Sequence, residues 1–138
     1  MTKNNKAIQP YKLSLMVSID GLDMRGPEPL SEREIASMWY VKGVLLLGEQ
    51  SRGFQMQAQR QLKRIRDLFD EGVKTKAEYI VLEPEDFKFL KKCWEQATFP
   101  EKANEVLMRL DDMLKQAQAD HDREVTELNN NKNNNKNK

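Results

Sequence analysis

The feature that most constrains this chain is the apolar run from Trp39 to Gly48. Apart from Lys42 and two glycines, every residue in the run is apolar, which predicts a helix buried on all sides. The run is far shorter than the ~20 apolar residues that span a bilayer, and charged residues flank it. We therefore expect a core helix with packing partners on several faces, and no membrane as a partner.

The residues before the run mark the start of this helix. Ser31 is followed three residues later by Glu34, which is the spacing of a capping box. Leu30 and Ile35 stand at the two positions of a hydrophobic staple. The sequence therefore predicts a helix over residues 31–48.

Two segments have the pattern of β-strands. In residues 11–19, aliphatic residues alternate with lysine, serine and methionine, which is the period of a strand with one buried face. Residues 77–82 form a short stretch rich in β-branched and aromatic residues. We expect these two segments to pair in a small two-stranded sheet.

Three further helices are predicted from apolar residues at helical spacing. Residues 54–71 separate a core face from a basic face, with Gly72 as the C-terminal cap. Residues 84–97 begin with proline and acidic residues, which suit the first turn of a helix. Residues 99–128 follow a second capping-box spacing. The predicted fold is α+β and predominantly helical, with four helices and one small sheet.

The last predicted helix also carries a seven-residue repeat, which is typical of a coiled coil. The repeat continues past the point where the helix of a compact domain usually ends, so we expect this helix to offer a seam, either to another chain or to its own domain. The residues spaced by sevens are Leu107, Leu114, His121 and Leu128.

The length of 138 residues fits one domain, which we place at residues 11–128 with a C-terminal helical extension. Residues 1–10 are expected to be a flexible segment and residues 129–138 a disordered Asn/Lys tail, because such composition cannot bury apolar surface. The net charge is +1, and five lysines in these two ends offset a mildly acidic body. Such a body lacks the strongly basic footprint of a dedicated nucleic-acid binder.

The inventory of reactive residues argues against catalysis. Cys93 is the single cysteine and His121 the single histidine, which excludes an internal disulfide and a metal site with several Cys or His ligands. Neither a phosphate-binding glycine loop nor a nucleophile motif occurs. We expect no enzyme, no catalytic or metal-binding residue and no cofactor. Because no secretory signal is visible, we expect a location in the cytoplasm, or inside a host cell or virion, rather than secretion.

The first functional hypothesis is a non-enzymatic interaction or assembly protein that acts as an oligomer. Its partner would be a second copy of the chain or another protein, bound along the seam of the C-terminal helix. Short assembly proteins of this kind suit a viral or phage component. The candidate interface residues are Leu107, Leu110, Leu114, His121 and Leu128.

The alternative hypothesis is a nucleic-acid-binding or regulatory protein. It would use the basic face of the second helix to contact phosphate, and its affinity would fall steeply with salt. This face lacks an aromatic residue placed to stack on a base, so we rank nucleic acid second among the partners. The candidate contacts are Arg60, Lys63, Arg64 and Arg66.

Overall fold

The computed structural model describes residues 9–18, 31–50 and 53–136. Within these residues the fold is α+β and predominantly helical, with four helices and a two-stranded antiparallel sheet, so the predicted fold class is confirmed. The elements in chain order are β1 (Tyr11–Ser14), α1 (Glu32–Gln50), α2 (Met56–Lys74), β2 (Tyr79–Leu82), α3 (Pro84–Gln96), the 3-10 turn η2 (Glu101–Ala103) and α4 (Asn104–Lys136).

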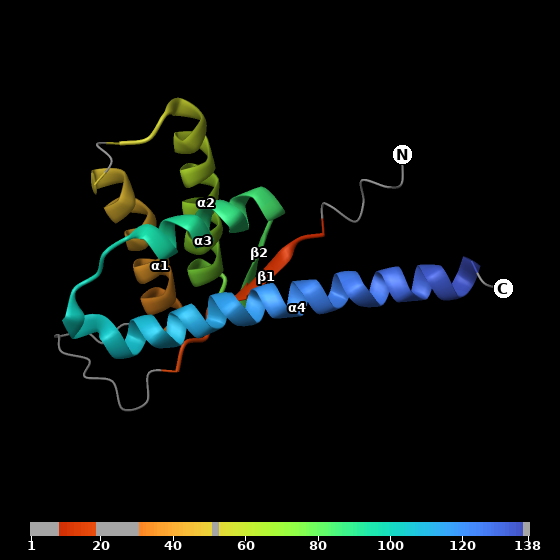
Figure 1. Ribbon diagram of the computed structural model, residues 1–138. Coiled ribbons are helices and arrows are strands. Elements are labelled where there is room, and N and C mark those ends of the chain that lie inside the picture. The colour runs from red at the N-terminus through yellow and green to blue at the C-terminus, as the bar shows by residue number, and fades with distance from the viewer. Residues whose placement is uncertain (1–8, 19–30, 51–52, 137–138) are drawn as a thin grey trace.

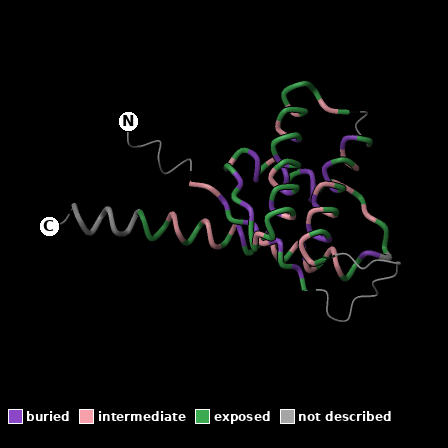
Figure 2. The backbone as a smooth tube through the Cα atoms, turned by 180° about the vertical axis from the view of Figure 1, so that it is seen from behind, coloured by how far each residue is buried: buried purple, intermediate pink, exposed green. Residues whose placement is uncertain are grey.

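Helices α1, α2 and α3 gather on one side of the sheet, and α4 crosses the domain and runs out past it (Figure 1). Seen from behind, the buried residues concentrate where the three helices meet the sheet and the first half of α4 (Figure 2). Residues 118–128 of α4, past the packed part, are exposed or half-buried. The molecule therefore consists of a packed body and one projecting helix.

The capping box predicted at the start of α1 is present. The backbone N–H of Glu34 donates to Ser31 Oγ at 3.2 Å, and the N–H of Ser31 donates to Glu34 Oε1 at 3.3 Å. These two bonds satisfy backbone donors that a helix N-terminus leaves without partners. The start of α1 is thus determined by its local sequence.

The strands are shorter than predicted because the ladder is limited by β2. Tyr11 pairs with Leu82 and Ser14 with Tyr79, so β1 is four residues long. Burial on alternate residues nevertheless continues along the chain, and Leu15 and Val17 are fully buried like Leu13. Residue 19, the predicted end of the strand, lies outside the described residues.

The expectation that α1 is buried on all sides is wrong. Ile35, Tyr40 and Val44 are buried, but Met38 is 41% exposed and Leu45 is 40% exposed. Among the described elements, α2 and α3 make the main contacts with α1, and they cover only the buried side. The opposite side of the apolar run therefore faces outward from the described part of the domain.

Helix α4 is longer than predicted. It ends at Lys136, whereas we expected a helix to residue 128 followed by a disordered tail. The backbone of residues 129–136 is helical, although asparagine has a low helix propensity. Because the packed first half supplies the nucleus, each added residue gains a hydrogen bond without a new nucleation step. Of the flexible segment predicted at residues 1–10, the first eight residues lie outside the described part of the chain.

Gly72 does not cap α2, because the helix continues to Lys74. It is buried in the helix and faces the sheet. A Cβ atom at this position would lie 2.7 Å from Cδ1 of Leu15 and 2.9 Å from Cγ2 of Ile80. The missing side chain therefore allows α2 to approach the sheet closely.

We predict that Gly72→Ala lowers the free energy of unfolding by about 1–2 kcal/mol, because overpacking of the buried sheet outweighs the helix propensity gained. Urea unfolding followed by circular dichroism measures the change. Gln59→Ala, an exposed substitution on the same helix, is the control and should have little effect. An unchanged stability of Gly72→Ala would show that α2 does not need this close approach.

Candidate protein interface

The first half of α4 is part of the domain core. Leu110 is 0%, Leu114 2% and Ala117 3% exposed, and this part of the helix packs across β1. Leu110 and Leu114, two of the five predicted interface residues, are therefore buried within their own domain. They are not available to a partner while the domain stays folded.

A buried hydrogen bond also ties α4 to the central helix. The hydroxyl of Tyr40 on α1 donates to the backbone carbonyl of Leu110 at 2.7 Å. Burial raises the pKa of Tyr40 well above its usual value, and the charge of Asp111 adds to the shift. The hydroxyl is therefore a neutral donor, and its bond fixes α4 against α1 as well as against the sheet.

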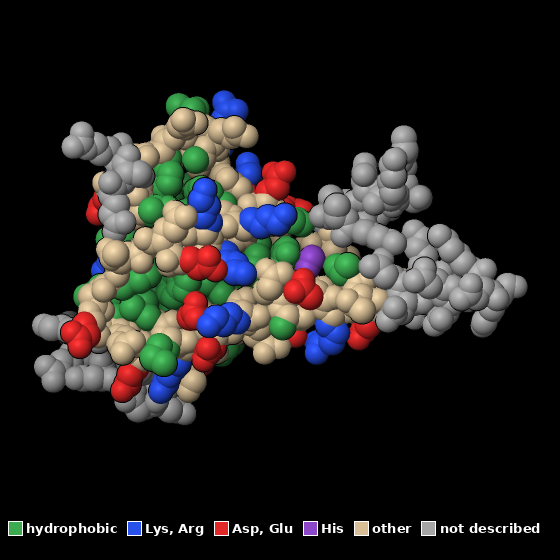
Figure 3. Space-filling view, in the orientation of Figure 1, with side chains coloured by type: hydrophobic (Ala, Val, Ile, Leu, Met, Phe, Trp, Pro, Cys, Tyr) green, Lys and Arg blue, Asp and Glu red, His purple; other side chains and the backbone are tan. Residues whose placement is uncertain are grey.

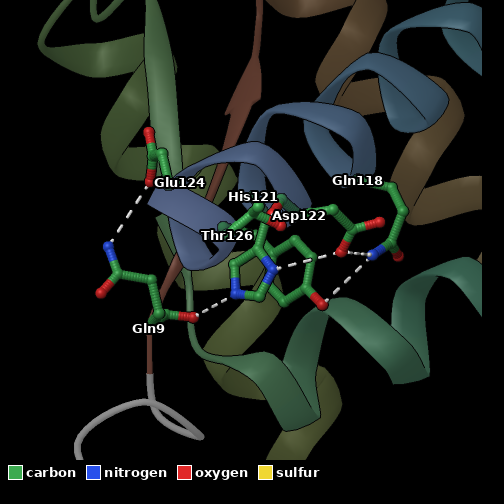
Figure 4. A network of polar contacts seen from close by, with 7 residues as sticks. Gln9, Gln118, His121, Asp122, Glu124 and Thr126 are labelled. Carbon is green, nitrogen blue, oxygen red and sulfur yellow. Dashed lines mark hydrogen bonds and ion pairs between the residues drawn. The ribbon is translucent and has the colours of Figure 1, made fainter. Parts of the chain in front are cut away.

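His121 marks the point where α4 leaves the domain. Its ring stacks on Tyr11 of β1 with centroids 3.7 Å apart, and Tyr11 stacks on Phe87 of α3 at 4.0 Å. His121 Nε2 lies 2.8 Å from the carbonyl oxygen of Gln9, and the side-chain amide of Gln9 donates to Glu124 at 3.4 Å (Figure 4). These contacts hold the start of β1 on α4.

The other ring nitrogen of His121 is less well satisfied. Nδ1 is buried without a hydrogen bond among the described residues, and the nearest carboxylate oxygen, from Asp122, is 3.7 Å away. The His121 side chain is only 12% exposed. Like Leu110 and Leu114, His121 therefore packs within its own chain.

We predict that His121→Ala lowers the free energy of unfolding by about 1–3 kcal/mol, because the ring stack and the contact to Gln9 are lost. Hydrogen exchange of the β1 amides should accelerate more than that of α2, which lies farther from the substitution. Glu127→Ala, an exposed change on the same helix, is the control and should leave both quantities unchanged. Equal exchange in β1 for both variants would contradict the anchoring role.

Beyond this anchor, α4 has an apolar pair, Val125 and Leu128, that is only partly covered. Val125 is half-buried and Leu128 is 48% exposed. Within the described residues, the last polar contact from α4 to another element is the one between Glu124 and Gln9. Of the predicted interface residues, Leu128 is exposed on the projecting part and Leu107 is half-buried on the packed part.

A groove lies between the C-terminal part of α3 and the first half of α4. Its volume is about 580 Å³. In the space-filling view, hydrophobic side chains gather in this hollow, and both acidic and basic side chains stand along its edges (Figure 3). The residues that line the groove are Trp94, Glu95, Phe99, Leu107, Met108, Asp111, Asp112 and Lys115.

Polar contacts hold one wall of this groove. The indole Nε1 of Trp94 donates to Asp111 Oδ1 at 3.1 Å, and Lys115 Nζ lies 3.0 Å from Asp111 Oδ2. Met108 is 61% exposed at the opening. The sequence did not indicate this groove, because its residues come from two helices and the linker between them. The available signal was Met108, a large apolar residue that lies off the apolar face of the predicted helix over residues 99–128.

The basic face of α2 is partly neutralised within the chain. Lys63 Nζ lies 2.9 Å from Asp67, and Arg64 binds the carboxylate of Asp86 with Nη2 at 3.0 Å. The Asp86 side chain is only 4% exposed, whereas that of Arg64 is 58% exposed. Arg60 and Arg66 are also exposed on this helix. Two of the four predicted phosphate contacts thus have an acidic partner in their own domain.

We predict that Arg64→Ala lowers the midpoint of thermal unfolding, because it leaves the buried carboxylate of Asp86 without its cation. The hydrogen bond to Asp86, together with the charge of Asp86, raises the pKa of Arg64 above its usual value. Arg66→Ala is the control, and its midpoint should match the wild type within error. Equal midpoints for the two variants, measured by differential scanning calorimetry, would contradict a structural role of Arg64.

The thiol of Cys93 is buried in the core. Burial raises the pKa of Cys93 to about 11, so its thiol is a poor nucleophile at neutral pH. Among residues 9–18, 31–50 and 53–136, no three His, Cys, Asp or Glu side chains are grouped to hold a metal ion. None of the helices in this part of the chain is long and apolar enough to cross a membrane.

Comparison with models of protein families, with curated proteins and with solved structures gave no match.

Proposed function

We propose that this chain is a non-enzymatic assembly protein that forms an oligomer through the part of α4 beyond His121. The observation that carries the proposal is the length of α4 relative to the domain. Its 33 residues make a helix about 50 Å long, and within the described residues the stack of His121 on Tyr11 is the last ring contact between α4 and the sheet. The second half therefore has a surface that the described domain leaves open.

The composition of this second half supports the need for a partner. Asparagine is a poor helix former, so an Asn-rich helical segment gains little stability from its own residues. The projecting segment ends in an Asn/Lys sequence. Packing of its apolar residues against another surface would supply the stability that its own composition lacks.

The apolar residues of this segment are suitably placed for helix packing. Val125 and Leu128 are spaced by three residues, so they lie on the same side of the helix. A single exposed leucine is ordinary on a protein surface, but here it continues the buried line of Leu110, Leu114 and Ala117. The same helix face would thus bind the sheet inside the domain and a partner beyond it.

We expect the wild-type chain to associate between about 1 and 100 micromolar, as measured by sedimentation velocity. Leu128→Asp should raise the dissociation constant at least about tenfold, because it places a charge at the apolar contact. Met56→Asp is the matched control, since Met56 is exposed on α2, away from the projecting helix. A wild-type chain that stays monomeric throughout this range would rule out the proposal.

A further inference from the structure

We infer that the groove between α3 and α4 is the docking site for the projecting half of α4 from a second copy, with the two α4 helices antiparallel. This inference rests on the proposed function, since it names the partner surface for the same helix. It makes the oligomer a dimer in which each copy both gives a helix and receives one.

The chemistry of the groove fits an apolar helix face. Trp94, Phe99 and Leu107 provide an apolar floor, and Met108 stands 61% exposed at the edge. The space of about 580 Å³ is shallow and open, so it suits side chains from one face of a helix rather than an enclosed small molecule. Burial of Met108 on docking would remove exposed apolar surface from water.

The charges around the groove favour a basic partner. Glu95 and Asp112 are exposed on the rim, whereas Asp111 already binds Trp94 and Lys115. The last ten residues of the chain carry three lysines and no acidic residue. This segment follows directly after Leu128, so an apolar contact in the groove brings a basic sequence close to an acidic rim.

The position of the groove on α4 determines the orientation. The groove uses residues 107–115 in the first half of the helix, and the projecting segment is the second half. Two antiparallel copies place each second half beside the other copy's first half, and a twofold axis makes the two contacts identical. A parallel pair would instead place the two acidic rims side by side, which is unfavourable.

The decisive experiment uses one variant on each side of the contact. Met108→Asp alters the groove and Leu128→Asp alters the projecting segment, and both positions are exposed, so the fold should be retained. Each variant alone should dimerise at least about tenfold more weakly than the wild type. An equimolar mixture should associate more strongly than either alone, because the heterodimer keeps one fully intact contact.

The outcomes separate this inference from the proposed function. If Met108→Asp dimerises like the wild type while Leu128→Asp does not, the projecting segments contact each other and the groove is not the docking site. Failure of the mixture to associate beyond the single variants also overturns the inference, whereas a monomeric wild type overturns both proposals. Met56→Asp serves as the control in the mixtures. Added salt should weaken the wild-type dimer, because it screens the rim from the lysines.

Discussion

The contact between β1 and α4 is the interaction on which the rest of the domain depends. Two strands of four residues are at best marginally stable in water without other elements to cover them. Here α2 and α3 pack against β2, and α4 packs against β1. Tyr11 and His121, from opposite ends of the chain, form one ring stack at this contact. A strand of four residues is therefore held by the longest helix of the described fold.

Local sequence signals predicted the elements well. The Ser31 capping box, the alternation from Tyr11 and the proline at the start of α3 each act within a few residues, and the structure contains the elements that they indicate. The role of Gly72 could not be predicted in this way. Its neighbours Leu15 and Ile80 come from two different segments, and only the folded chain brings them against α2.

The sequence could not predict which surface each apolar helix face packs against. A heptad repeat is the same pattern whether the opposing surface belongs to the same chain or to another. Leu110 and Leu114 are buried in their own domain, while Leu128 on the same helix is 48% exposed. In the same way, the apolar run of α1 indicated a core helix but not that Met38 and Leu45 would remain exposed. The pairing of Arg64 with Asp86, across two helices, likewise required the fold.

The continuity of α4 has a mechanical consequence. Its helix runs from Asn104 to Lys136 without an interruption, so the anchored and the projecting parts form one lever. The direction of the projecting part is set by residues that pack inside the domain. They include Leu110, whose carbonyl accepts the hydrogen bond from Tyr40, and His121, which stacks on Tyr11. A core substitution that tilts the anchored part of α4 by a small angle would move the far end of the helix more than it moves the residues inside the domain. The geometry of any assembly built on the projecting part is thus determined in the interior of the domain.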